Sequence, residues 1–222
     1  MGREPWAPLA LLIALAVILS GCDRPDWMKR ERRAEWRDRA EAICLRSDAV
    51  RPSAYVRQMR PINGPGSCGA RRPFQVSAAM GGQVALAPAA VLGCPMIPQV
   101  DSWLAGDVQP AAVSLFGEPV REVEVAASYS CRTRNGKRGA KMSEHAYVNA
   151  LDVRAFRLMS GRRISVERGW NGPLDEAVFL RSAHEGACRR FRTIIGPDGD
   201  RHHRDHFHLD LAWHGKDDVY CR

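Results

Sequence analysis

Six cysteines limit the folds that this chain can adopt, because they follow a leader of the kind that exports a protein into an oxidising compartment. An even number of cysteines in such a compartment predicts three disulfides. The order of the cysteines does not decide their pairing, and we expect neighbours to pair. A thiolate zinc site is disfavoured because no two of them are two to four residues apart. The expected pairs are Cys44 with Cys68, Cys94 with Cys131, and Cys188 with Cys221.

Residues 1–22 have the pattern of a lipoprotein signal peptide. Arg3 precedes an apolar run over residues 9–19, which is shorter than the roughly 20 apolar residues that a bilayer-crossing helix requires. The run ends in Leu-Ser-Gly-Cys at residues 19–22, which resembles the lipobox of bacterial lipoproteins and implies acylation of Cys22. A plain cleaved signal is the alternative. We therefore expect a periplasmic or cell-envelope protein, anchored to a membrane through lipid on Cys22.

The next segment, residues 23–43, is rich in charges of both signs. It contributes several of the cations behind the net charge of +8. Because acidic residues interleave these cations, the segment favours a solvated helix over a nucleic-acid-binding surface. We expect a helix at residues 27–46 that tethers a single domain over residues 44–222, and no nucleic-acid partner.

The domain mixes expected strands with expected helices. Residues 120–128, 150–156 and 207–212 have the β-branched or alternating pattern of strands. Residues 175–191 have apolar positions near one face and predict a helix, and residues 88–94 are able to open another. Residues 52–73 hold Asn-Gly-Pro-Gly and predict a loop that Cys68 staples.

Histidines and one aspartate within an apolar run form the candidate site. Four of the seven histidines lie between positions 202 and 208, and in a strand His206 and His208 point to the same face. Asp152 lies in an apolar run, where a carboxylate is unfavourable unless something compensates it. A metal ion is one compensation, and hydrogen-bonded polar core residues are the other. His145 is close enough in sequence for a turn to bring it beside Asp152.

These residues resemble two motifs of a known group. Residues 143–152 resemble the Ser-x-His-x-x-Gly-x-Ala-x-Asp motif of the LAS metallopeptidases, which join lysostaphin-type and D-alanyl-D-alanine peptidases with hedgehog domains. His206-Phe-His208 resembles the second motif of that group. The chain is also similar to the bacterial extensin-like C-terminal family over residues 44–222, including Ser-Tyr-Ser-Cys-Arg at 128–132 and the final Cys-Arg. Val148 departs from the motif because it stands at the glycine position.

The resemblance implies a zinc centre and a fold. His145, Asp152 and His208 would be the zinc ligands, with a fourth position left for water. Three protein ligands and one open position are typical of a catalytic zinc site. The implied fold is α+β, with a small, mainly antiparallel sheet that carries the ligands on one face and is flanked by helices, as in hedgehog and D-alanyl-D-alanine peptidase domains.

The general base has two candidates. His206 matches the first histidine of the second motif, and Asp205 matches the place where D-Ala-D-Ala dipeptidases keep a glutamate. We prefer His206 because it shares the strand face of His208, whereas Asp205 is expected to point away unless the strand begins with a bulge. His203 is interpreted as a surface histidine, with a polarising role as the alternative.

Substrate contacts are expected from Arg132 and Ser143. Arg132 matches a substrate-side arginine of the family, where a guanidinium holds a carboxylate or stabilises an oxyanion. Arg134 is the rival for that role, and a surface salt bridge is the plain alternative for Arg132.

The resemblance implies a zinc-dependent peptidase or amidase that acts on peptidoglycan peptides, and the leader is consistent with a place at the cell envelope. The alternatives are a non-catalytic, zinc-containing module that binds the cell wall, and a structural envelope lipoprotein.

Overall fold

The computed structural model describes residues 26–215 and 218–222, with side chains from residue 35 onward. The leader and Cys22 lie outside the described residues, and with them the predicted lipidation. The chain divides into two compact units, Met1–Asp38 and Arg39–Arg222. The helix expected at residues 27–46 is confirmed as α2, Asp26–Arg46. Within the described ranges, no helix combines the length and apolarity needed to cross a membrane.

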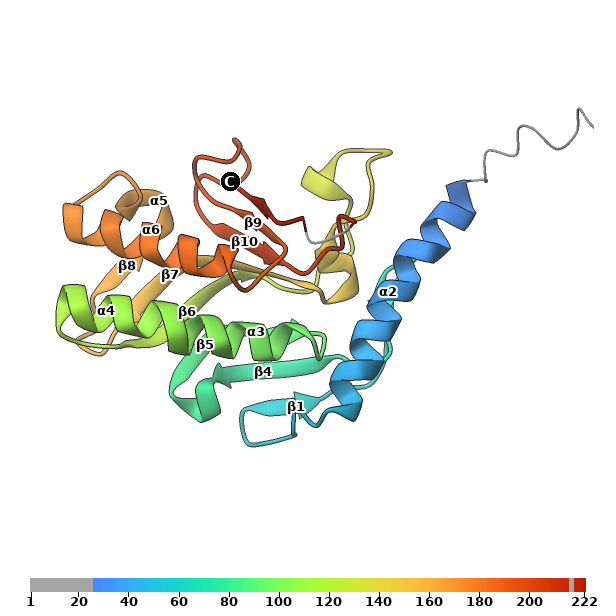
Figure 1. Ribbon diagram of the computed structural model, residues 1–222, viewed down its shortest axis with the longest axis horizontal. Coiled ribbons are helices and arrows are strands. Elements are labelled where there is room, and N and C mark those ends of the chain that lie inside the picture. Colours follow the sequence, from blue (N-terminus) through green and yellow to red (C-terminus); the bar gives the residue numbers. More distant parts are fainter. Residues whose placement is uncertain (1–25, 216–217) are drawn as a thin grey trace, which may run out of the picture. The chain divides into compact units, whose positions relative to one another are not determined.

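A mixed sheet forms the centre of the second unit (Figure 1). The described residues give it nine strands, in the order β1-β4-β5-β6-β7-β10-β9-β11, with β8 paired to β7 and with β2 and β3 forming a separate pair. The strands are β1 Val56–Gln58, β2 Ile62–Asn63, β3 Gly69–Ala70, β4 Phe74–Ala79, β5 Val84–Leu92, β6 Val120–Ala127, β7 Ala150–Leu158, β8 Arg163–Ser165, β9 Thr193–Ile195, β10 Phe207–Asp210 and β11 Tyr220–Cys221.

The prediction of an α+β fold is confirmed, but the prediction of a small, mainly antiparallel sheet is wrong. β5 pairs with β6 in parallel, and β11 pairs with β9 in parallel. The physical reason for the first pair is the connection, since parallel neighbours need a crossover and the segment between these strands is helical. Residues 88–94 belong mostly to β5 and do not open a helix.

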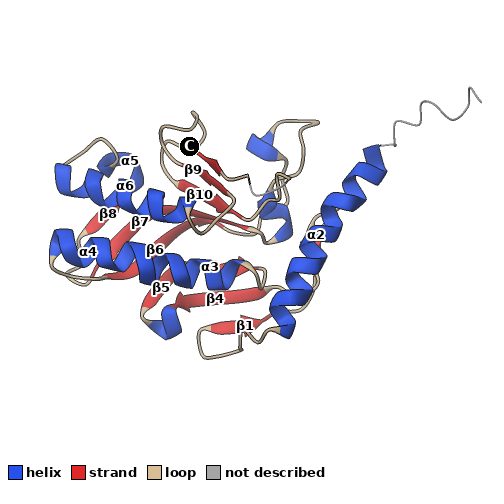
Figure 2. Cartoon of the chain, in the orientation of Figure 1, coloured by secondary structure: helices blue, strands red, loops and turns tan. Residues whose placement is uncertain are grey.

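The crossover helices and α6 pack together over one face of the sheet (Figure 2). The crossover consists of α3 Met96–Trp103, the π-helical turn η3 Leu104–Val108 and α4 Gln109–Phe116. The predicted helix at 175–191 is confirmed as α6, Leu174–Cys188, preceded by the short α5, Val166–Gly169. Trp103 is fully buried between the layers, donates from its indole nitrogen to the carbonyl of Ala183, and meets Phe156 and Phe191 edge-on.

The two faces of the sheet have different roles at β7 and β10. Leu151 and Val153 on β7, like Phe207 and Leu209 on β10, belong to the hydrophobic core. Because side chains alternate along a strand, Asp152 and His208 point to the opposite face. Asp152 and His208 are also direct cross-strand partners in the antiparallel register, so the sheet itself brings these two polar side chains together.

Three disulfides are present, as predicted, and they join Cys44 to Cys94, Cys68 to Cys131, and Cys188 to Cys221. The third pair is the one expected. The expected pairs Cys44–Cys68 and Cys94–Cys131 are wrong, because pairing follows the three-dimensional path of the loops and not their order. The loop before β3 meets the segment after β6, where the Ser67 hydroxyl lies 3.1 Å from the Tyr147 hydroxyl and Cys68 is joined to Cys131.

Candidate metal centre

The structure brings the three predicted ligands together. His145 comes from the short 3-10 turn η5, Glu144–Tyr147, while Asp152 and His208 come from β7 and β10. His145 Nε2 lies 3.0 Å from Asp152 Oδ1 and 3.2 Å from His208 Nδ1, and His208 Nδ1 lies 2.9 Å from Asp152 Oδ1. The side chains are buried, with exposed fractions of 0%, 3% and 8% for His145, Asp152 and His208.

The outer nitrogens of the two histidines fix where their protons lie. His145 Nδ1 is 2.5 Å from the carbonyl oxygen of Ser128, and His208 Nε2 is 2.8 Å from Asp210 Oδ2. A carbonyl or carboxylate oxygen only accepts hydrogen bonds, so each of these nitrogens carries the hydrogen. In the neutral rings, His145 Nε2 and His208 Nδ1 therefore present lone pairs to each other and to Asp152.

This donor set fits a zinc ion. Two imidazole lone pairs and one carboxylate oxygen converge, and one proton links only two of these atoms, whereas a cation satisfies all three. Tetrahedral zinc with bonds of about 2.0–2.1 Å has ligand atoms about 3.3 Å apart, close to the observed 2.9–3.2 Å. Outer hydrogen bonds of the kind made by Ser128 and Asp210 are typical of histidines that bind metals.

The electrostatics of the cluster favour a positive charge. Burial alone would lower the pKa of His208, but hydrogen bonds to Asp152 and Asp210 outweigh it and raise the pKa to about 10. Burial would raise the pKa of Asp152, but the hydrogen bonds from His145 and His208 outweigh it and hold the pKa far below its usual range. Asp152 is therefore ionised and presents a negative charge to a cation held between the three side chains.

A cavity of about 540 Å³ opens beside the triad and is lined by His208, His206, Arg132 and Ser143, among others. Two of its lining residues approach the second carboxylate oxygen of Asp152: His206 Nε2 lies 3.7 Å away and Arg132 Nη2 lies 3.8 Å away. His206 Nδ1 is 2.8 Å from Asp205 Oδ1, and this hydrogen bond lowers the pKa of Asp205. The two candidates for the general base are thus directly connected.

The remaining predicted residues lie around the same cavity. The Ser143 hydroxyl accepts a hydrogen bond from the backbone N–H of His145 at 3.4 Å, so Ser143 also caps the turn that carries a ligand. Arg134 lines the cavity as well. The expectation that His203 lies on the surface is wrong: it is only 8% exposed, and its Nδ1 lies 2.8 Å from Asp200 Oδ1.

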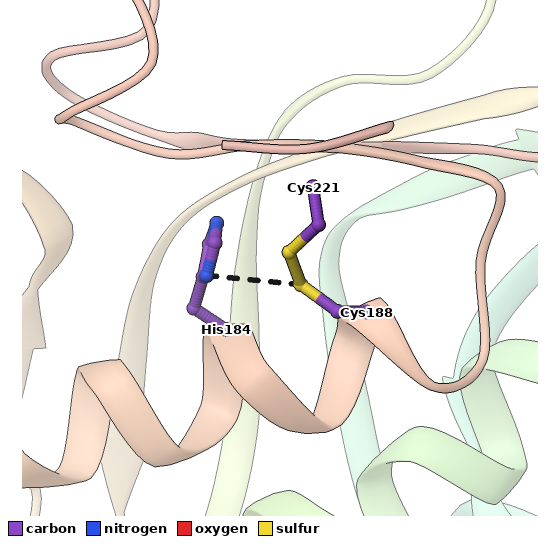
Figure 3. Close-up of side chains that lie close together, drawn as sticks. All are labelled: His184, Cys188 and Cys221. Carbon is purple, nitrogen blue, oxygen red and sulfur yellow. Dashed lines mark hydrogen bonds between the residues drawn. A yellow bond between two sulfur atoms is a disulfide. The ribbon is translucent and has the colours of Figure 1, made fainter. Parts of the chain in front are cut away.

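A second group of side chains of the kinds that bind metals consists of His184, Cys188 and Cys221 (Figure 3). It lies on the side of α6 that faces away from the crossover helices. Cys188 and Cys221 form a disulfide with each other, so neither sulfur is a free thiolate. His184 Nδ1 lies 4.0 Å from the Cys188 sulfur, and its Nε2 lies 3.0 Å from the backbone oxygen of Arg222. In this oxidised form the group holds the end of the chain in place and offers no metal site.

The sequence profile described as "Extensin-like protein C-terminus" matches residues 42–222. The chain belongs to this family. The searches of curated proteins and of solved structures gave no match. The predicted resemblance to the extensin-like family is thereby confirmed.

Sequence reasoning missed one important residue of this extensin-like domain. Asp210 is 4% exposed and fixes the tautomer of His208. A signal was present, because Asp210 follows His208 by two positions and so shares its strand face.

Val148 illustrates how the extensin-like chain builds the turn that carries His145. It has a left-handed backbone, with φ of 53°, at the position where the LAS motif has glycine. A β-branched residue rarely adopts this conformation. Val148 therefore holds a backbone conformation that glycine would adopt without strain.

Proposed function

We propose that this protein is a zinc-dependent peptidase or amidase that acts on the peptide part of peptidoglycan. The observation that carries the proposal is the buried His145–Asp152–His208 triad, whose donor atoms converge beside a cavity. Three protein ligands next to an open cavity are typical of catalytic zinc sites, whereas structural sites are usually closed by four protein ligands. The likeness of residues 143–152 and 206–208 to the LAS motifs supports hydrolysis of an amide, and kinship with that group is part of the proposal.

His206 is the proposed general base. When bound, zinc of this three-ligand type acts as a Lewis acid and makes a water nucleophilic near neutral pH. His206 donates from Nδ1 to Asp205, which leaves the lone pair of Nε2 directed toward the triad. That nitrogen accepts the proton of the attacking water and returns it to the leaving amine. Asp205 acts through His206, as a positioning residue.

Arg132 is the proposed electrostatic partner of the substrate. Its guanidinium is 38% exposed, lines the cavity and lies beside Asp152 without a close ion pair. A guanidinium placed there binds a substrate carboxylate or the oxygen that becomes negative during attack. Ser143 lines the same wall and is the second proposed substrate contact.

The proposed location is the cell envelope, with lipid on Cys22 as the anchor. Family membership supports an extracellular or envelope protein, and peptidoglycan is the polymer that an exported, anchored enzyme meets there. Basic side chains around the cavity complement the carboxylates of wall peptides.

Metal content tests the centre first. We expect about one zinc per chain by elemental analysis, lost in His145→Ala and in His208→Ala. His202→Ala is the matched control, since His202 lines the same cavity but lies outside the triad. A folded, metal-free parent protein that takes up no added zinc would refute the proposal.

Cleavage of wall peptides then separates an enzyme from a binding module. New amine ends from the parent protein, with cleavage lost and zinc retained in His206→Gln, are the expected results. Full activity in that variant would exclude His206 as the base. Stoichiometric binding of wall fragments without new amine ends would favour a non-catalytic module instead.

A further inference from the structure

A short basic hairpin, residues 132–142, forms one side of the cavity. It has five cations and no acidic residue: Arg132, Arg134, Lys137, Arg138 and Lys141. All of them except Arg132 are classed as exposed. Of these five cations, only Arg132 lies within ion-pair distance of a carboxylate that the structure describes, and that contact with Asp152 is long at 3.8 Å. The hairpin therefore presents positive charge that the described part of the protein does not neutralise.

The base of the basic hairpin is held in place. Thr133 and Met142 form an antiparallel bridge, and the backbone of Arg134 donates to the carbonyl of Lys141 at 2.9 Å. Just before the hairpin, Cys131 is joined to Cys68 by a disulfide. At the tip, Asn135 has a left-handed backbone that closes the turn. These contacts reduce the conformational entropy that the hairpin would lose when a ligand binds.

The hairpin is also continuous with the metal centre. Arg132 and Arg134 line the same cavity as His206 and His208, so a ligand that reaches the triad passes the hairpin. Two of its cations, Arg132 and Arg134, line the cavity, and the other three lie on the exposed part of the same short loop. This spread suits an extended chain with several acidic groups. A bilayer surface would instead contact the exposed tip alone and would not need the cavity.

We propose that the basic hairpin binds carboxylates of an acidic peptide and directs its backbone into the metal centre. The inference rests on the proposed peptidase or amidase function and names its substrate class: a peptide with acidic side chains near the cleaved bond. Arginine forks and lysine ammonium groups form charge-assisted hydrogen bonds with carboxylates, and exposed pairs of this kind respond strongly to salt.

Direct binding tests the proposal without requiring cleavage. The probes are two short fluorescent peptides of equal length, one with three glutamates and one with glutamines in their place. The hairpin variant is Arg134→Gln with Lys137→Gln and Arg138→Gln. The matched control is Arg71→Gln with Arg72→Gln and Arg121→Gln, which removes three exposed cations that do not line the cavity. Both variants lower the net charge equally.

We expect the full-length parent to bind the glutamate peptide more tightly than the glutamine peptide, and the hairpin variant to lose about tenfold in affinity, equivalent to about 1.4 kcal/mol. The control should change affinity by less than about twofold, and the difference should shrink at high salt. Equal loss in both variants, or equal affinity for both peptides, would overturn the proposal. The proposal would also be overturned if the hairpin variant lost binding to phosphatidylglycerol vesicles but kept binding to the glutamate peptide. Binding of the glutamate peptide together with no cleavage of wall peptides would refute the peptidase and leave the hairpin's role intact.

Discussion

Replacing Asp210 with asparagine should weaken zinc binding at the proposed centre without unfolding the protein. The Asp210 carboxylate accepts two hydrogen bonds at 2.8 Å, from His208 Nε2 at one oxygen and from the backbone N–H of Ala212 at the other. An asparagine side chain offers one oxygen and one NH2 group, so one of these donors would face another donor. Leaving a buried donor unsatisfied costs about 1–3 kcal/mol.

His208 can avoid that cost, whereas the backbone of Ala212 cannot. If the proton of His208 moves from Nε2 to Nδ1, Nε2 accepts from the asparagine NH2 group and Nδ1 donates to Asp152. The fold then keeps its hydrogen bonds, but Nδ1 has no lone pair for a metal. We expect zinc affinity to fall about 10–100-fold, the usual effect of changing such an outer partner, equivalent to about 1.4–2.7 kcal/mol.

Competition with a chromogenic chelator measures the zinc affinity, and thermal unfolding of the metal-free protein measures stability. Asp200→Asn is the matched control: it alters a second aspartate–histidine pair in the same cavity, with His203, which is not a triad member. In Asp200, one carboxylate oxygen accepts both hydrogen bonds, and the single oxygen of asparagine can take its place. Zinc affinity in Asp200→Asn should therefore stay within about twofold of the parent. Unchanged zinc binding in Asp210→Asn would refute the tautomer argument.

Three further predictions concern stability. Hydrogen bonding from Arg163 lowers the pKa of Glu124, so Glu124→Gln should lower the unfolding free energy by about 1–2 kcal/mol at pH 7. In urea titrations, this difference from the parent should disappear as the pH falls through the lowered pKa of Glu124. A difference that persists at pH 2 would contradict the prediction. Replacing Cys68 and Cys131 together by serine opens a link between residues 63 apart and should lower the unfolding free energy by about 2–4 kcal/mol. Denaturant titration of the oxidised variant and the oxidised parent measures this difference, which should vanish when both proteins are reduced. Val148→Ala should destabilise the protein more than Val148→Gly. Both variants lose a buried side chain, but only glycine relieves a left-handed backbone that costs about 1–2 kcal/mol. The opposite order of stability in thermal unfolding would show that the turn is not strained.

The strand pattern of the sequence was sufficient to predict which way Asp152 and His208 point, whereas their role as metal ligands with His145 came from the resemblance to the LAS motifs. Alternation places Asp152 opposite to the core-facing Leu151 and Val153, and it gives His208 the same relation to Phe207 and Leu209. Both patterns are local, so they are readable without knowing which strands pair. The expected strands and the expected helix α6 were confirmed for the same reason.

Non-local features were not predictable from such patterns. The parallel pairing of β5 with β6 depends on how the crossover helices pack. Pro88 lies within β5, and because proline is unusual inside a strand, the sequence of this continuous strand looked like two short runs. The pairing of Cys68 with Cys131 depends on a loop that crosses the fold. In each case the deciding contact joins segments whose distance in sequence carries no information about their distance in space.

The candidate metal centre and the hydrophobic core depend on the same strand register. A slip of one residue between β7 and β10 would turn Leu209 and Phe207 out of the core and carry His208 away from Asp152 at the same time. The core side chains therefore hold the ligands in place, although none of them touches the cavity. His145 is set independently, by the turn that ends at Val148. The triad is thus assembled by two devices, a paired register and a tight turn, and a change to either should weaken metal binding before it unfolds the domain.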